Sequence, residues 1–365
     1  MTQRQPVRLN RRHFVALAVL TTAAGIVAIF KGRFVTNSPA TSGARRTPRA
    51  AVLKSPIIGL IQRDGRRPAG YAASISNIVI QVPLSQVWPS QTMMNFAPID
   101  ALIAQAKADG IKAARLRITT GMQAPSWIGK QVGTYKVTSM TNTLGTYDCP
   151  IWWGKAYLDL HKAFDAALAA CYDSDPFIHE VSIWAVGNTY SAEPAIRGFA
   201  GAANRAAAIA AGFTTTIDLA ACYGFVDSMS SHWVTTRLQG WVPMGWQTLV
   251  GNRVKSDMNV TASYAKHIIS VNPHANIGID NADQVAYSQD PTYAMRRGLL
   301  GLWTHGDQTA TWGRLGSSGA NLMATLKSAA VDGVSSMELP SGYNAGVTPS
   351  QMAVYDAALR ANTKG

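Results

Sequence analysis

Short apolar runs alternate with segments of helical periodicity along most of the chain after residue 54. The runs that predict strands lie at 55–62, 76–89, 111–121, 180–188, 240–250, 275–283, 299–308 and 334–342. The segments that predict helices lie at 97–110, 153–176, 195–213, 263–273, 291–299, 319–333 and 348–362. Segment 97–110 is typical, because its apolar residues fall on one helix face and a glycine ends it.

Strand followed by helix, repeated about eight times, is the order of parallel βα units. Because such crossovers are right-handed, these units predict an α/β fold that closes into a (β/α)₈ TIM barrel over residues 55–365. Segment 122–153 interrupts the alternation and is interpreted as an insertion. A doubly wound open sheet is the alternative, although no glycine-rich phosphate loop follows the first predicted strand.

The first 54 residues have a different pattern. A basic flank precedes the apolar segment 14–30, and Arg11-Arg12-His13-Phe14 is similar to the start of a twin-arginine export signal. We expect residues 1–30 to be a signal peptide or an uncleaved membrane anchor, and residues 31–54 to be a disordered linker. The protein is therefore expected to be exported from a bacterial cell or tethered to its membrane through residues 14–30.

The net charge of +13 first suggests a nucleic-acid partner. Residues 1–50, however, hold nine of the 33 Lys and Arg residues and no Asp or Glu. The remaining 24 basic residues face all 20 acidic ones, a net charge of +4. No basic stripe with interleaved aromatic residues follows, so the sequence predicts no nucleic-acid binding.

The carboxyl ends of barrel strands form one mouth, where functional side chains gather. Several predicted strands run into polar or aromatic residues there, most clearly in Val181–Pro194, which begins apolar and ends polar. The candidate substrate-binding residues are Arg117, Asn188, Tyr190, Trp88, Trp246, Asn281, Trp303, His305 and Gln308. Tryptophan faces stack on sugar rings, and amides and carboxylates bind hydroxyl groups, so we expect a carbohydrate ligand.

Glutamate is scarce in this chain. The only three are Glu180, Glu193 and Glu338, and the last two follow or end predicted strands. Two carboxyl groups across a mouth can cleave a glycosidic bond, because one protonates the leaving oxygen and the other attacks the anomeric carbon or activates water. The structural alternatives are a helix-terminus charge for Glu193 and an ion pair, for example with Arg117, for Glu338.

Four segments together resemble the retaining glycosidase barrels of glycoside hydrolase clan A, in the style of bacterial β-galactosidases and cellulases. They are QVPLSQVWPSQ, IKAARLRITTGMQAPSWI, SDPFIHEVSIWAVGNTYSAEP and VSSMELPSGY. The resemblance covers about residues 75–195 and, more loosely, 330–345. It implies Glu193 as the acid/base and Glu338 as the nucleophile. It also implies that Arg117 and Asn188 bind substrate or orient the nucleophile.

The sequence departs from that family in two respects. Clan A barrels usually place Asn directly before the acid/base Glu, whereas TYSA separates Asn188 from Glu193 here. Their carboxylates lie on strands four and seven, whereas Glu338 falls on the eighth predicted strand. The alternatives to a cofactor-free, metal-free glycosidase are therefore a barrel that binds sugar without cleaving it and a scaffold at the cell envelope. The oligomeric state is not predicted.

Overall fold

The computed structural model of the chain describes residues 52–63, 65–138, 145–184, 201–242, 246–279 and 319–362. It also describes Phe199, Leu315 and the backbones of 34–36 and 306–308. The chain divides into two compact units, residues 1–31 and 32–365, and all of the described residues belong to the second. The predicted signal or anchor, residues 1–30, lies outside them, as does most of the predicted linker.

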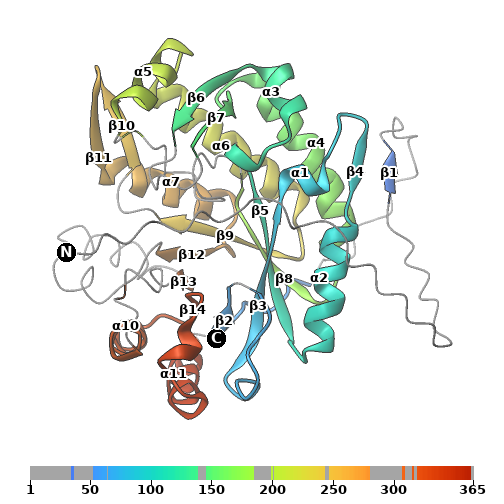
Figure 1. Ribbon diagram of the computed structural model, residues 1–365, viewed down its shortest axis with the longest axis vertical. Helices are drawn as coiled ribbons and strands as arrows, with labels where there is room; N and C mark the ends of the chain where they lie inside the picture. The colour runs from blue at the N-terminus through green and yellow to red at the C-terminus, as the bar shows by residue number, and fades with distance from the viewer. Residues whose placement is uncertain are drawn as a thin grey trace, which may run out of the picture. The chain divides into compact units, whose positions relative to one another are not determined.

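Eight strands of the described residues form one parallel sheet (Figure 1). In chain order they are β2 (Gly59–Gln62), β3 (Ile75–Pro83), β5 (Ala113–Thr119), β8 (Ile178–Ser182), β9 (Arg237–Val242), β12 (Asn276–Ile279), β13 (Gly306–Gln308) and β14 (Ser336–Leu339). Sheet neighbours are chain neighbours, and the first strand, β2, also pairs with the last, β14. The two edge strands, β12 and β13, contact each other as well. This order differs from that of a doubly wound sheet and is consistent with the predicted barrel.

Helices follow the strands, as the alternating pattern predicts. They are α2 (Ala97–Ala108), α4 (Lys155–Tyr172), α5 (Ala202–Ala210), α6 (Thr215–His232), α7 (Met258–Val271), α10 (Gly319–Val331) and α11 (Pro349–Ala361). Shorter helical turns are α1 (Leu84–Val87), α3 (Ser126–Val132), η1 (Gly121–Gln123) and η2 (Tyr343–Ala345). Gly110, at φ +74°, follows the end of α2 in the left-handed conformation that ends many helices.

The core lies between the strands and these helices. Leu116 and Ile118 of β5 belong to its larger cluster, together with buried residues of α2, α4, α6 and α7. On α4, Tyr157, Phe164 and Leu168 occupy one face at helical spacing. A second cluster joins α10 and α11 to β2 and β14. Side chains alternate along a strand, so Arg115 and Arg117, which alternate with Leu116 and Ile118 on β5, point to the inner face of the sheet.

Among the described residues, three antiparallel strand pairs accompany the parallel sheet. They are β6 (Thr134–Thr138) with β7 (Thr146–Pro150), β10 (Trp246–Val250) with β11 (Arg253–Asp257), and β1 (Phe34–Thr36) with β4 (Met93–Asn95). The first pair lies in segment 122–153, which the sequence predicted as an insertion. Predicted strand 240–250 is not continuous, since β9 ends at Val242 and β10 begins at Trp246. Pro243, which has no N–H to donate, stands between them.

The segment before β2 is fastened to the amino ends of the parallel strands. Lys54 Nζ donates to the backbone oxygens of Asp175 and Ile178, both at 2.7 Å, and to Thr236 Oγ1 at 2.8 Å. Burial lowers the pKa of Lys54 to about 8, although nearby carboxylates oppose the shift. Within the described residues, no single helix is long and apolar enough to cross a membrane; only α5 and α6 together pass that test, with an 80° bend between them.

Candidate active site

A cluster of four charged side chains is buried on the inner face of the parallel sheet. Arg115 and Arg117 come from β5, Glu180 from β8 and Glu338 from β14. The exposed fraction of the side chain is 0% for Arg115, Glu180 and Glu338 and 3% for Arg117. Charged groups are almost never buried this far unless they are paired, and here two cations face two anions.

Arg115 links the two carboxylates. Its Nε and Nη2 donate to Oε2 of Glu180 at 2.8 and 2.6 Å, and its Nη1 donates to Oε1 of Glu338 at 2.6 Å. Nη2 of Arg117 donates to the same oxygen of Glu338. Charge-assisted bonds from a planar guanidinium fix direction as well as distance, so the Glu338 carboxylate is held in one orientation.

The electrostatics favour an ionised Glu338. Burial by itself would raise the pKa of this carboxyl group, but the charges of Arg117, Arg115 and Arg63 outweigh burial and hold its pKa below the ordinary value. Burial likewise acts against the charge of Arg115, yet the two carboxylates keep the pKa of this guanidinium above its ordinary value. Next to the end of its strand, Glu338 is therefore an ionised carboxylate.

Neutral groups complete the surroundings of the cluster. Trp241 of β9 faces both guanidinium ions, whose carbon atoms lie 5.5 Å from its ring centroid, within the range of cation–π attraction. The second oxygen of Glu180, Oε1, accepts from the backbone N–H of Ile57 at 2.9 Å and from the amide of Asn276. Both oxygens of Glu180 are thus engaged, which fixes this side chain as firmly as Glu338.

Amide and hydroxyl groups lie at or near the ends of several strands. Gln81 Oε1 accepts from Nη1 of Arg117 at 3.4 Å, and Gln62 Oε1 accepts from the hydroxyl of Tyr343 at 2.8 Å. Ser182 Oγ donates to Gln239 Oε1 at 3.0 Å. In the part of the chain that is described, no three His, Cys, Asp or Glu side chains gather to hold a metal ion. The donors and acceptors named here bond to one another.

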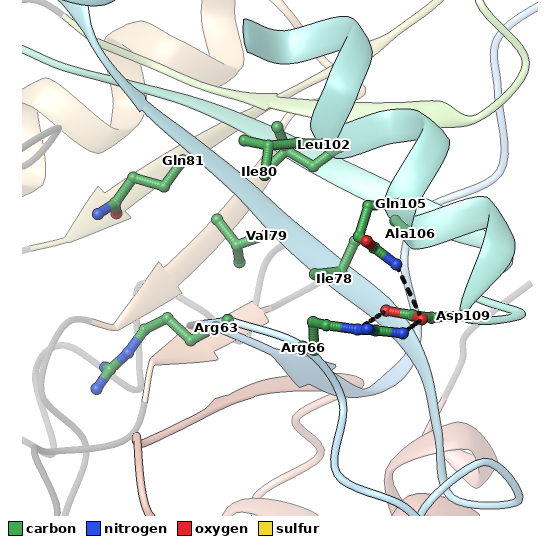
Figure 2. Close-up of a pocket in the computed structure, with 11 residues that line it drawn as sticks. Arg63, Arg66, Ile78, Val79, Ile80, Gln81, Leu102, Gln105, Ala106 and Asp109 are labelled. Carbon is green, nitrogen blue, oxygen red and sulfur yellow. Dashed lines mark hydrogen bonds and ion pairs between the residues drawn. The ribbon is translucent and has the colours of Figure 1, made fainter. Parts of the chain in front are cut away.

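A cavity of about 240 Å³ lies between β3, α2 and the segment that follows β2 (Figure 2). Its apolar wall consists of Ile78, Val79, Ile80, Leu102 and Ala106. Figure 2 shows Arg63 and Gln81 towards one end and the ion pair of Arg66 with Asp109 at the other. Because Gln81 also accepts from Arg117, the cavity adjoins the charged cluster.

Two of the candidate sugar-stacking residues lie in the hydrophobic core. The ring of Trp88 packs on Trp127 at 4.8 Å and on Phe164 at 5.2 Å between centroids. The ring of Trp246 is fully buried, and its indole N–H donates to Asp218 Oδ2 at 3.0 Å. These contacts give both rings a structural role, while their part in sugar stacking stays a prediction.

The remaining candidates divide between the cluster and the residues that are not described. Arg117 and Glu338 form the ion pair that was the structural alternative for Glu338. The backbone of Gln308 is the register partner of Glu338 on the neighbouring strand. The candidates outside the described residues are Glu193, Asn188, Tyr190, Asn281, Trp303 and His305. The pairing of Glu193 with Glu338 therefore stays a prediction.

Sequence reasoning did not single out Arg115, Trp241 or Asn276, and it treated Glu180 only as the start of a strand. A signal was present, because charged or polar residues recur at every second position of these largely buried strands. In β5 these are Arg115 and Arg117, and in β8 they are Glu180 and Ser182. Alternation of this kind indicates a polar inner face along the strand, rather than polar residues only at its end.

No protein-family model matches the chain, and no curated protein matches its sequence. Solved structures do match in fold. The catalytic domain of β-amylase from Paenibacillus polymyxa superposes with a TM-score of 0.51 and 9% identity, over 86% of this chain and 100% of that domain. The exo-β-1,4-mannosidase Op5Man5 from Opitutaceae bacterium strain TAV5 gives a TM-score of 0.50 and 10% identity, over 88% of this chain and 63% of that enzyme.

A β-galactosidase from Rahnella sp. R3 is also similar, with a TM-score of 0.49 and 13% identity over 86% of this chain and 58% of that enzyme. The chain thus spans less than two thirds of the mannosidase and of this galactosidase. At such identities the likeness establishes the fold alone. The chain has the fold of the glycoside hydrolase barrels that its sequence resembles, in a divergent form.

Proposed function

We propose that this protein is a glycoside hydrolase that cleaves O-glycosidic bonds by a retaining mechanism. The observation that carries the proposal is the state of Glu338, an inward-facing carboxylate that two arginines keep ionised near the end of a parallel strand. A nucleophilic carboxylate must be ionised to attack. The fold match to a β-amylase and a β-mannosidase supports a carbohydrate substrate for this chain as well.

In the proposed reaction, Glu338 attacks the anomeric carbon while Glu193 protonates the leaving oxygen. A covalent glycosyl-enzyme forms, and Glu193 then removes a proton from the water that releases the sugar. Arg117 holds the attacking carboxylate in place. The proposed substrate-binding residues are Asn188, Tyr190, Trp88, Trp246, Asn281, Trp303, His305 and Gln308.

A second function has one observation in its favour. In this structure Oε1 of Glu338 already accepts N–H groups from both arginines, and the side chain is fully buried. A buried carboxylate that is paired with two arginines can stabilise the fold without taking part in a reaction. The second candidate is therefore a barrel at the cell envelope that binds carbohydrate without cleaving it.

The test is hydrolysis of a panel of aryl β-glycosides by the full chain and by Glu193→Gln and Glu338→Gln. We expect the wild type to cleave at least one member, and each variant to lose on the order of 10²-fold to 10⁴-fold in rate. Proton NMR of the first-formed sugar should show retention of the anomeric configuration. Azide should restore turnover in Glu338→Ala by replacing the missing nucleophile, with a glycosyl azide as the product.

Asp148→Asn is the matched control, because it alters an exposed carboxylate of the β6–β7 pair, outside the parallel sheet and the cavity, and it should keep the wild-type rate. Circular dichroism establishes that each variant is folded. Folded variants at Glu193 and Glu338 that match the wild type would overturn the catalytic pair. A wild type that cleaves nothing but binds oligosaccharides in calorimetry would instead support the second candidate.

We also propose that residues 1–30 direct export or tether the protein to a membrane, ahead of a linker at 31–54. The support is the Arg11-Arg12-His13-Phe14 start and the apolar segment 14–30. The test is cell fractionation of the wild type and of a variant with Lys at positions 11 and 12. Retention of the variant in the cytoplasm is expected, and equal distribution of both proteins would contradict a twin-arginine signal.

A further inference from the structure

Arg115 occupies an unusual place in the charged cluster, because one guanidinium serves two carboxylates that come from different strands. Two of its nitrogens donate to Glu180, and the third donates to Glu338 at 2.6 Å. All three side chains have an exposed fraction of 0%. The sequence does not indicate this contact, since Arg115 and Glu338 lie 223 residues apart.

The Glu180 end of this bridge is rigid. Its Oε2 accepts twice from Arg115, and its Oε1 accepts from the backbone N–H of Ile57 and from Asn276. Ile57 is itself 1% exposed. Because the guanidinium is planar, fixing two of its nitrogens also fixes the direction of the third, which is the one that reaches Glu338.

We propose that Arg115 and Glu180 are a positioning pair that orients the Glu338 carboxylate and sets its charge environment. The inference rests on the proposed role of Glu338 as the nucleophile. Glu180 holds the guanidinium and balances its charge, Arg115 holds one oxygen of Glu338, and neither residue touches the substrate. Arg117 holds the same oxygen from the next inward position of β5.

The charges that face Glu338 determine how each variant should change the pKa of its carboxyl group. From β5 these are Arg115 and Arg117, and from the segment after β2 it is Arg63. On the neighbouring strand β13, the backbones of Asp307 and Gln308 pair with those of Met337 and Glu338. Removing Arg115 removes one of the cations, whereas removing the charge of Glu180 leaves the positive charge of Arg115 unbalanced. The two changes should therefore move the pKa of Glu338 in opposite directions.

The chain has only three glutamates, so carbon-13 labelling of glutamate side chains gives three carboxyl signals to titrate. Variants at Glu193 and Glu338 assign them. The variants compared are Glu180→Gln, Arg115→Met, Arg115→Lys and the double variant that combines Arg115→Met with Glu180→Gln. The matched control combines Lys136→Met with Asp148→Asn, which removes a cation–carboxylate pair on β6 and β7, outside the parallel sheet.

We expect the titration midpoint of Glu338 to rise by about one unit or more in Arg115→Met, since an opposite charge within a few ångströms lowers a carboxyl pKa by about 1–3 units. In the double variant it should rise less, because the opposing charge of Glu180 is lost as well. In Glu180→Gln it should fall further, and in the control it should not change. The double variant removes the pair as a neutral unit and is expected to fold even if the single variants do not. An unchanged Glu338 midpoint in every folded variant would overturn the inference.

Kinetic measurements distinguish a positioning role of Arg115 and Glu180 from a purely structural one. In the double variant and in Arg115→Lys, kcat on the best aryl glycoside should fall about 10-fold to 100-fold with little change in KM, because a misdirected nucleophile slows attack more than binding. A KM effect with unchanged kcat would argue against positioning. If the wild type cleaves no substrate, the proposed function fails, while the titrations still decide whether this pair controls Glu338.

Discussion

Two buried carboxylates are held in contrasting ways in this molecule. On the inner face of the sheet, Glu338 accepts hydrogen bonds from the guanidinium groups of Arg115 and Arg117. On the outer side, Asp218 of α6 accepts from the neutral indoles of Trp152 and Trp246, one on each oxygen and both at 3.0 Å. Both carboxylates have an exposed fraction of 0%.

The difference lies in the donors rather than in the depth of burial. Cationic donors lower the pKa of a carboxyl group and so keep it ionised. Perturbed pKa values of this kind are common at functional sites. The two indoles come from segment 122–153 and from β10, so Asp218 fastens both to α6. Burial alone therefore does not mark a functional acid, and the two carboxylates differ in the charge of the groups that donate to them.

Replacement of Glu338 by Gln should give the largest loss of stability. Arg115 and Arg117 would stay buried with one counter-charge fewer, and breaking a buried ion pair costs about 3–5 kcal/mol in the free energy of unfolding. Urea denaturation at pH 7 measures the loss. Asp148→Asn, in the exposed pair with Lys136, is the control and should change little. A loss as small as that of the control would mean that the cluster is not held together by its charges.

His161 of α4 offers the opposite case, a buried base that stays neutral. Burial lowers its pKa to about 4, although Asp165 opposes the shift. The unfolded chain, in which a histidine pKa is about 6.5, binds the proton first, so the free energy of unfolding should fall as the pH drops from about 6.5 to about 4. The fall should be on the order of 3 kcal/mol. Denaturation across this range, repeated with His161→Gln, should give a flatter curve for the variant.

His232 provides the control for that experiment. Its hydrogen bond to Asp165 raises its pKa, so its contribution to stability is present at low pH and is lost as the pH rises above about 6.5. His232→Gln should lower stability across the acid range by a constant amount and leave the slope of the curve between pH 4 and 6.5 unchanged. If this variant flattens the curve between pH 4 and 6.5 as much as His161→Gln does, the assignment to His161 is wrong.

Asp218→Asn should have a smaller effect. The new amide sets an N–H donor against an indole N–H, and a buried donor left unsatisfied costs about 1–3 kcal/mol. Thermal unfolding and glycosidase rates of the same sample test the contrast with Glu338. A folded Asp218→Asn protein that lost activity as completely as Glu338→Gln would contradict the division between the two carboxylates.

Trp246→Phe should give the smallest change. It removes one hydrogen bond to Asp218 and keeps an aromatic ring in the core, at a cost near the low end of about 1–3 kcal/mol, because Asp218 keeps its bond from Trp152. Thermal unfolding measures that cost, and KM for the best aryl glycoside tests the predicted sugar contact. A raised KM with unchanged stability would show that the ring serves the ligand rather than Asp218.

The elements themselves were largely predictable from periodicity. The predicted helix 97–110 is α2, the predicted helix 153–176 contains α4, and the eight predicted parallel strands correspond to observed ones. Helix α6 was not predicted, because its buried face includes the polar residues Asp218 and Ser228 and gives no clear apolar stripe. Predicted strand 240–250 had the wrong bounds, because it covers the end of β9 and all of β10, two strands with different partners.

The sequence determined that Arg117 and Glu338 stand on parallel strands, since local alternation and strand order place them there. It also determined that Glu338 belongs to the eighth strand, which the structure places beside the first. Only the tertiary structure decided that Arg115 reaches both Glu180 and Glu338, on β8 and β14. The period of a strand fixes which face a side chain takes, but its partner across the sheet depends on how the strands curl and on how far each side chain extends.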